Sequence, residues 1–265
     1  MDHFEVQHRR LRSLFGVFFA PEVTGALLPL ARPALRLTAG AEGTVRFGGT
    51  PLLPPGESWP SWQGRPLDYL GSVDFGLVPE VPGLPPKGTA AFYYTAGPPR
   101  PWGDDPDHRG AWRVFTGDLQ KTDAPALPER TLDAEPFLSL PAPQEPLLNR
   151  IEGLYSGTLA VYEQLHAAWQ QHVWPDATPV HQLGGWPALV QRPVGTDCHR
   201  ASTGLEGDAS FTIDEQVAVN EEWRLLLQLD SDDGLGWHWG DPGRLYFCTH
   251  LDSAPETAWM TLQAT

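Results

Sequence analysis

Hydrophobic residues recur at helical spacing in two segments, residues 3–19 and 157–173. In the first segment the apolar positions on one face are Phe4, Leu11, Leu14, Phe15 and Phe18. In the second they are Val161, Tyr162, Leu165, Ala168, Trp169 and Val173, and Pro175 follows as a stop signal. The pattern therefore predicts one amphipathic helix in each half of the chain.

Short apolar runs bounded by Gly and Pro predict strands through most of the remaining sequence. The predicted strands are residues 34–38, 44–47, 69–75, 89–95, 112–116, 209–213, 223–229, 244–249 and 259–262. Residues 195–210 are predicted to be a loop. Because strands outnumber helices, we expect a mainly β protein, an α+β fold with a few peripheral helices.

Two stretches of the chain carry the same motifs in the same order. Gly48-Gly49-x-Pro51 precedes a predicted strand that ends at Asp74, and Gly184-Gly185-x-Pro187 precedes one that ends at Asp230. Each Asp is followed by a Gly and then by a Phe: Gly88 and Phe92 in the first stretch, Gly243 and Phe247 in the second. This order predicts internally duplicated antiparallel sheet units that fold against each other around Trp-rich contacts. Chance similarity in a chain rich in Gly and Pro is the alternative.

A proline-rich stretch separates the two motif sets. Six prolines lie between residues 121 and 148: Pro125, Pro128, Pro136, Pro141, Pro143 and Pro146. Proline removes backbone donors and resists regular structure. We therefore interpret residues 121–150 as a linker between an N-terminal half, 1–120, and a C-terminal half, 151–265, which together form one compact unit.

The same motifs carry a family resemblance. The residues are Gly48-Gly49-Thr50-Pro51-Leu52-Leu53-Pro54, His181-Gln182-Leu183-Gly184-Gly185-Trp186-Pro187, Leu226-Leu227-Gln228-Leu229-Asp230-Ser231-Asp232 and Trp239-Gly240-Asp241-x-Gly243-Arg244-Leu245-Tyr246-Phe247. The chain resembles the YwqG-like bacterial proteins, also called DUF1963, over roughly residues 30–255. The resemblance implies a cytoplasmic, mainly β, duplicated fold and no particular reaction.

Composition and charge narrow the classes of partner. The formal net charge is −15, with 18 Lys and Arg against 33 Asp and Glu. Nucleic-acid and anionic-membrane binding both depend on basic side chains, so we expect neither. Cys198 and Cys248 are too few for a disulfide framework, and reduced thiols in a cytoplasmic protein are expected. Arg9, Arg10 and the apolar run after them loosely mimic a signal peptide, but the helical spacing favours a surface-docked helix.

One loop concentrates the candidate chemistry. Between the strands at 223–229 and 244–249 lie Asp230, Asp232, Asp233, His238, Trp239 and Asp241. We predict a ligand site at Asp230, Asp232, His238, Trp239 and Asp241, with Trp59 as a more distant member. The alternatives are a purely structural loop, fixed by its Asp side chains, and a site for a hard cation such as Ca²⁺ or Mg²⁺. We assign no metal-ligand set and expect no cofactor.

No catalytic signature is present in the sequence. There is no His-Glu-x-x-His, Cys-x-x-Cys, Gly-x-Ser-x-Gly or phosphate-binding Gly-Lys-Ser/Thr. The leading hypothesis is a non-enzymatic binding protein for a protein or small-molecule partner, with a cleft lined by Trp59, Trp62, Trp186 and Trp239. The alternatives are a hydrolase or transferase using Asp230, His238 and Asp241, and a metal-dependent regulator.

Overall fold

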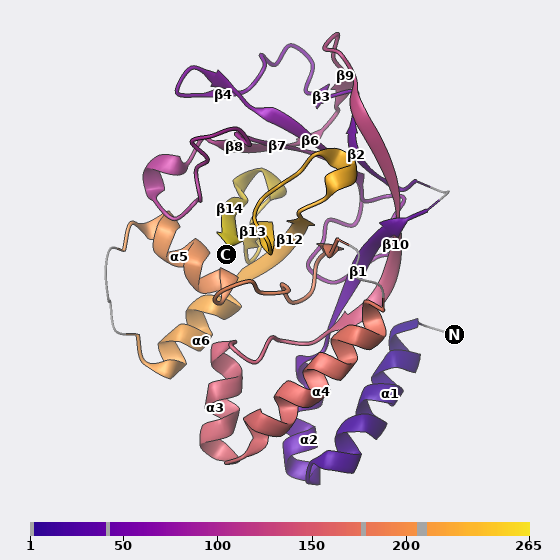
Figure 1. Cartoon of the computed structure of the whole chain (residues 1–265), viewed down its shortest axis with the longest axis vertical. Coiled ribbons are helices and arrows are strands. Elements are labelled where there is room, and N and C mark those ends of the chain that lie inside the picture. Colours follow the sequence, from indigo (N-terminus) through magenta and orange to yellow (C-terminus); the bar gives the residue numbers. More distant parts are fainter. Residues whose placement is uncertain (1–2, 41–42, 176–178, 206–210) are drawn as a thin grey trace.

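The computed structural model describes residues 3–40, 43–175, 179–205 and 211–265, and its centre is one antiparallel sheet (Figure 1). The sheet has ten strands in the order β14-β13-β12-β11-β1-β10-β2-β6-β7-β8. In chain order the strands are β1 (Arg32–Ala39), β2 (Val45–Gly49), β6 (Asp68–Asp74), β7 (Thr89–Tyr94), β8 (Trp112–Gly117), β10 (Leu127–Ser139), β11 (His181–Leu183), β12 (Trp223–Asp230), β13 (Gly243–His250) and β14 (Trp259–Ala264). The predicted mainly β class is confirmed.

The strand order is the same on both sides of a central pair. β1 and β10 pair along their length, from Arg32 with Ser139 to Ala39 with Leu132. Outward from β10 run β2, β6, β7 and β8, and outward from β1 run β11, β12, β13 and β14. This arrangement is what a duplicated unit predicts, but duplication itself stays a prediction that a superposition of the two sets would test.

The sheet curls until its two edges approach each other, and this encloses the main core. Trp112 of β8 donates from Nε1 to the carbonyl oxygen of Ala258, just before β14, at 2.9 Å. Inside the curl, the ring centroids of Phe92 (β7) and Phe247 (β13) are 5.2 Å apart. The strands of both halves therefore share a single hydrophobic interior.

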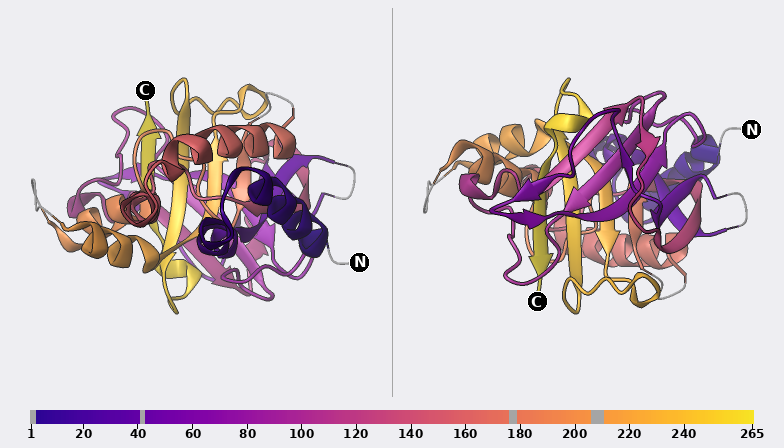
Figure 2. Two further views of the ribbon diagram at one scale, coloured as in Figure 1. Left: turned by 90° about the horizontal axis from the view of Figure 1, so that it is seen from below. Right: turned by 90° about the horizontal axis from the view of Figure 1, so that it is seen from above.

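The described residues form six α-helices, which lie outside the sheet or at its ends. They are α1 (His3–Phe18), α2 (Pro21–Leu27), α3 (Pro146–Leu154), α4 (Thr158–Val173), α5 (Val194–Thr203) and α6 (Ile213–Glu221). Seen from below, α1 to α4 lie in front of the sheet, and seen from above the strands of the first half lie in front (Figure 2). Leu11 and Phe15 of α1 and Trp169 of α4 are buried against β10, so both predicted helices are confirmed. No helix in the described part of the chain has the length and apolar character needed to cross a bilayer.

The proline-rich stretch is not irregular throughout, because nearly half of it forms β10. The two prolines within β10, Pro128 and Pro136, occupy positions where strand pairing does not require a backbone N–H. Pro128 lies in a bulge where the β10–β2 register shifts between Leu127 and Arg130. Pro136 lies beyond Leu132, where the pairing with β2 stops. The segment predicted as a linker thus supplies the centre of the sheet, whereas the proposed domain division stays a prediction.

Two predictions near residue 200 are wrong. Residues 194–203 form α5 instead of a loop, because Val194, Cys198 and Ala201 make a buried helical face. The predicted strand 209–213 lies partly outside the described residues, and its end is the start of α6, where Thr212 and Glu215 form a capping box. Cys198 and Cys248 are free thiols and both are buried.

Candidate functional site

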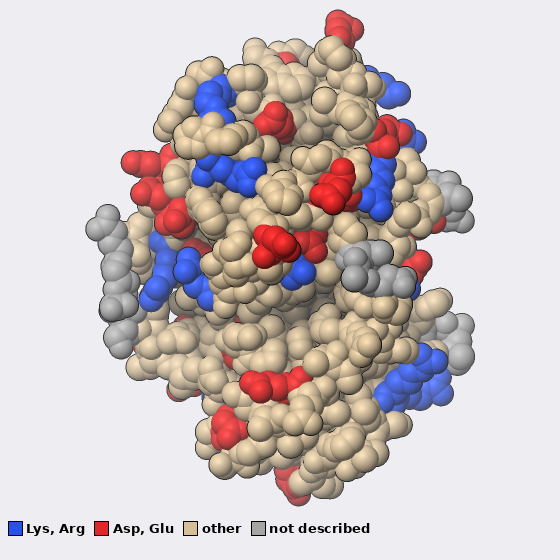
Figure 3. All heavy atoms as spheres, viewed as in Figure 1, with Lys and Arg blue, Asp and Glu red and all other residues tan. Residues whose placement is uncertain are grey.

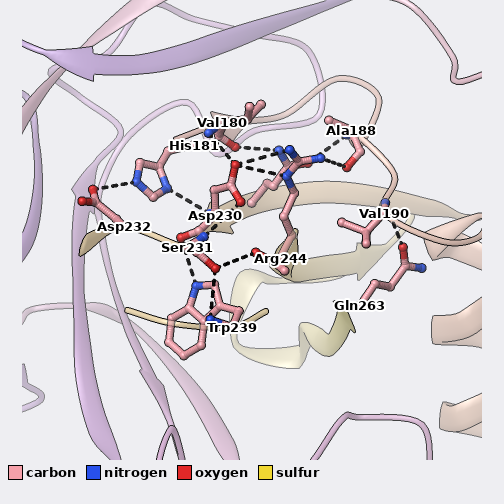
Figure 4. Close-up of polar contacts among 12 residues, drawn as sticks. Val180, His181, Ala188, Val190, Asp230, Ser231, Asp232, Trp239, Arg244 and Gln263 are labelled. Carbon is pink, nitrogen blue, oxygen red and sulfur yellow. Dashed lines mark hydrogen bonds and ion pairs between the residues drawn. The ribbon is translucent and has the colours of Figure 1, made fainter. Parts of the chain in front are cut away.

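A buried polar network that includes His181, Asp230 and Asp232 holds the acid-rich loop after β12 (Figure 4). Asp232 is 2% exposed. Its Oδ2 atom lies 3.1 Å from Nε2 of His181 (β11) and also accepts a hydrogen bond from Nη1 of Arg130 (β10). Its Oδ1 atom accepts from the backbone N–H of Gly234 at 2.9 Å. One carboxylate thus joins three segments of chain.

The hydrogen bonds of His181 fix its protonation state. Nδ1 accepts from the backbone N–H of Asp230 at 3.1 Å, which leaves Nε2 as the protonated nitrogen that donates to Asp232. Burial lowers the pKa of His181, and the neighbouring Asp232 offsets this only in part. The ring is therefore neutral, and both nitrogens are occupied by the protein itself.

The same contacts set the charge of Asp232. Burial acts to raise the pKa of Asp232, but its bonds to His181, Arg130 and the Gly234 N–H together outweigh burial and lower that pKa. Asp232 is therefore a carboxylate whose acceptor atoms are already used. This arrangement leaves it without the proton or the free oxygen that acid–base catalysis requires.

Asp230 is fixed in the same way at the end of β12. Its carboxylate accepts from the backbone N–H groups of Val180 at 2.8 Å and Ser231 at 3.0 Å. Arg244 of β13 lies 3.3 Å from the same carboxylate and donates from Nη1 to the carbonyl oxygen of Ala188 at 2.9 Å. These bonds tie the chain before and after β11 to the β12–β13 pair.

Of the other predicted site residues, only Trp239 bonds to this network through its side chain. Trp239 is buried and donates from Nε1 to the Asp230 carbonyl oxygen at 3.0 Å, so its ring belongs to the core. The side chains of His238 and Asp241 are exposed. Among the described residues, no hydrogen bond or ion pair joins Asp230, His238 and Asp241, the set expected for a hydrolase or transferase.

Trp59 lies on the opposite face of the sheet from Trp239. The Trp59 ring contacts Tyr93 at 5.7 Å between centroids, whereas Trp239 contacts Tyr94 at 6.1 Å. Neighbouring residues of a strand point to opposite faces, which separates the two tryptophans. Trp186 packs in the helix-side cluster instead. The structure therefore does not bring the four predicted tryptophans together in one cleft.

Metal binding has no support in the arrangement of the acidic loop. Within residues 3–40, 43–175, 179–205 and 211–265, no group of three or more His, Cys, Asp or Glu side chains is placed to hold a metal ion. Asp230 and Asp232 direct their oxygens at backbone N–H groups, arginines and His181, as described above. The arrangement matches the structural interpretation of the loop.

A cavity of about 600 Å³ lies at the other end of the same strands. It forms because β11 is short. β11 pairs with Leu35–Leu37 of β1 and with Leu227 and Gln228 of β12, and then the chain turns away at Gly184 and Gly185. β1 and β12 run parallel to each other and begin at this end, so their first residues face each other across the space that β11 leaves.

Two arginines line this cavity, Arg32 at the start of β1 and Arg224 at the start of β12. The Arg32 guanidinium lies 3.5 Å from the centroid of the Trp186 ring, and Trp186 is held by a 2.7 Å bond from Nε1 to the Leu30 carbonyl oxygen. Arg224 donates from Nη1 to the carbonyl oxygens of Glu221 and Trp223 at 2.5 and 2.9 Å. Burial, and then repulsion from Arg224, lower the pKa of Arg32 to about 10.

Sequence reasoning missed both arginines, and the ligand site that it predicts around Asp230 lies at the opposite end of β12 from this cavity. Along β12, Arg224 and Asp230 are six residues apart, which places them roughly 20 Å from each other. The sequence does contain a partial signal for these arginines. In a chain with few basic residues, Arg32 and Arg224 each stand just before a run of apolar residues. Their proximity depends on the order β12-β11-β1, which neither local sequence contains.

A buried carboxyl lies behind Arg32. Glu145 is 1% exposed and accepts a hydrogen bond from Nδ2 of Asn220 at 2.6 Å. Burial raises the pKa of Glu145 to about 7, although Asn220 and Arg32 partly oppose the shift. The folded protein therefore holds a proton on Glu145 at pH values where an unfolded chain does not.

This raised pKa makes stability depend on pH. Below pH 4.5 the side chain is protonated in both states, and its contribution is lost as pH rises towards 7, because ionisation then opposes folding. We expect the Glu145→Gln variant to gain stability relative to the wild type over this interval, by about 3 kcal/mol above pH 7. Urea unfolding at pH 4.5, 6, 7 and 8 measures the difference. The exposed Glu57→Gln variant should show no such trend, and a constant Glu145→Gln difference would contradict the assignment.

The fold is that of a mainly β protein on one curled antiparallel sheet, and a buried polar network holds its acid-rich loop. The sequence profile of the family described as "Domain of unknown function (DUF1963)" matches residues 45–254. Since this match spans most of the chain, the protein belongs to the DUF1963 family, and the resemblance to that family is confirmed. Among curated proteins, none matches the sequence.

Proposed function

We propose that the protein is a non-enzymatic binding protein that holds a small organic molecule in the cavity where β1 and β12 begin. The observation that carries this proposal is the cavity itself. Its volume of about 600 Å³ falls in the range of small-molecule sites, roughly 300–1,000 Å³. Its wall combines the starts of β1 and β12, the loop 82–85 and the turn 249–255.

Two further observations support this proposal: one favours binding over catalysis, and the other favours a small ligand over a large partner. His181, Asp230 and Asp232 are the buried titratable groups next to the acid-rich loop, and their polar atoms bond to one another, to backbone or to arginine. The net charge of −15 also forms no single patch on the face shown in Figure 3, where acidic side chains are scattered and interspersed with basic ones. A small ligand in a cavity therefore fits better than a large basic partner on that face.

The test is to obstruct the cavity with one substitution. Ser253 lines the cavity and is exposed, so tryptophan in its place should fill the mouth. Glu256→Trp, on an exposed position three residues later that does not line the cavity, is the matched control. Wild-type protein and both variants are dialysed to equilibrium against a small-molecule extract of the native host, and the retained molecules are identified by mass spectrometry.

The proposal expects one or a few compounds to be retained, unchanged, by the wild type and by Glu256→Trp but not by Ser253→Trp. Retention of nothing by the wild type, or equal retention by Ser253→Trp, would contradict binding in this cavity. Chemical conversion of a retained compound would contradict the non-enzymatic role.

A further inference from the structure

The Arg32 guanidinium is a half-buried cation that has no ion-pair partner in the described part of the chain. In the described part of the chain it forms no ion pair and no side-chain hydrogen bond, and its one specific contact is the face of Trp186 at 3.5 Å. Stacking on an aromatic ring covers a flat side of a guanidinium but leaves its N–H donors directed outward in the plane. Those donors are available to a molecule in the cavity.

Arg224 adds a second cation from the facing wall. Its Nη1 atom is held by two backbone carbonyl oxygens, of Glu221 and Trp223, which anchors the side chain and leaves Nη2 and Nε unused. The charge of Arg224 disfavours the charge of Arg32 and, after burial, contributes to the lowered pKa of Arg32. A pair of like charges in one cavity is stabilised when an anion binds between them.

The nearby acidic groups do not supply that anion. Glu145 lies behind Arg32, outside ion-pair distance, and its pKa of about 7 means that it is partly protonated near neutral pH. The backbone carbonyl oxygen of Glu221 accepts from Arg224, whereas the Glu221 carboxylate forms no ion pair with either arginine and only partly offsets the lowering of their pKa values. Asp252 lines the cavity from an exposed turn at the rim. The positive charge at the base of the cavity is therefore only partly balanced from within the protein.

The remaining lining is mostly apolar. Apart from the polar residues of the turn 249–253, the side chains of the wall are mostly prolines and leucines, such as Pro82, Leu84, Leu225 and Pro255. Such a wall favours burial of an apolar body next to the charged end. The overall charge of −15 disfavours a polyanion, which limits the ligand to a small molecule.

We propose that the cavity binds a small amphipathic organic anion, with its carboxylate or phosphate group between Arg32 and Arg224 and its apolar body against the proline and leucine wall. The inference rests on the proposed function, because it names the class of ligand for that same cavity. Carboxylate and phosphate share the oxyanion geometry that a guanidinium recognises through paired hydrogen bonds.

Calorimetric titration with four probes tests the charge requirement in the wild-type protein. Octanoate and octyl phosphate carry the two candidate head groups, octanamide carries the same chain without charge, and inorganic phosphate carries charge without the chain. We expect octanoate or octyl phosphate to bind at least about tenfold more tightly than octanamide and inorganic phosphate. The preferred head group then distinguishes a carboxylate ligand from a phosphate ester.

Two variants test the residues. Arg32→Gln and Arg224→Gln should each weaken binding of the preferred anion about tenfold or more and leave octanamide binding unchanged. Arg46→Gln, at an exposed position on β2 outside the cavity, is the matched control and should bind as the wild type does. Because Arg32 also stacks on Trp186, thermal melting checks that the Arg32→Gln variant still folds. The Arg224→Gln variant, at a half-buried position, removes the other positive charge independently of that stacking.

The outcomes separate this inference from the proposed function. Equal binding of octanoate, octyl phosphate and octanamide, abolished by Ser253→Trp, would overturn the anion assignment while keeping the cavity as a binding site. Unchanged anion affinity in both glutamine variants would also overturn it. If no probe binds and the dialysis retains no compound, the anion assignment and the binding role both fail.

Discussion

Replacing Asp232 with alanine is expected to lower the free energy of unfolding by about 3–5 kcal/mol, the usual effect of removing one partner from a buried ion pair. Asp232 is almost fully buried and is the common partner of Arg130, His181 and the Gly234 N–H. Its loss leaves the Nε2–H of His181 without an acceptor in the interior. Urea unfolding followed by circular dichroism measures the change.

The adjacent Asp233 provides the control for this prediction. Asp233 is exposed, so Asp233→Ala should change stability by no more than about 0.5 kcal/mol. The loss of stability in Asp232→Asn should lie between the losses in Asp232→Ala and Asp233→Ala. The amide oxygen can still accept from the Gly234 N–H, but the charge that pairs with Arg130 is gone. An Asp232→Ala variant within 1 kcal/mol of the wild type would show that the network is not a structural centre, and would return the acid-rich loop to consideration as a ligand site.

Gly185→Ala is expected to destabilise the protein by about 4 kcal/mol and to weaken ligand binding. The backbone of Gly185 has a φ of +71°, which is unfavourable for a residue with a Cβ atom by about 1–2 kcal/mol. An added Cβ would also lie 2.3 Å from Oγ of Ser139 and 2.6 Å from the Cβ of Ala34, and overpacking of this kind costs about 1–3 kcal/mol. Ser139 accepts from the Trp186 N–H, so its displacement would shift the ring on which Arg32 stacks.

Gly83→Ala separates the backbone effect from the overlap. Gly83 has a φ of +89°, but no atom lies within 4 Å of an added Cβ, so only the backbone contribution of about 1–2 kcal/mol is expected. Denaturant unfolding of both variants gives the difference that belongs to the overlap. Equal destabilisation by the two substitutions would mean that Ser139 and Ala34 move aside without strain.

Much of the fold could be predicted from the sequence because local patterns determine it. Strand β7 stands out as a run of apolar and aromatic residues after Gly88, and α4 as an apolar stripe that is followed by Pro175. β10 was missed because its two prolines argue against a strand, and only the bulge and the limited pairing with β2 make them acceptable. α5 was missed because its buried face depends on small residues such as Cys198 and Ala201.

The candidate site was predicted less well, since its geometry is set by contacts between distant segments. Asp230 and Asp232 were found because they cluster in one loop, but their partners His181 and Arg130 lie about 50 and 100 residues earlier in the chain. Arg32 and Arg224 are farther apart still in the sequence. They line the same cavity only because the strand between β1 and β12 is three residues long. Such pairs become visible once the strand order is known.

The position of β1 between β10 and β11 has a consequence for synthesis on the ribosome. Once residue 139 has emerged, a nascent chain contains β1, β10, β2, β6, β7 and β8, yet β1 still presents one open edge of unpaired backbone groups. That edge is covered only when residues 181–183 arrive, so translation of the intervening segment leaves it exposed to other growing chains. We expect the α3–α4 region, which is made in this interval, to be where slow translation or a chaperone matters most for the yield of folded protein.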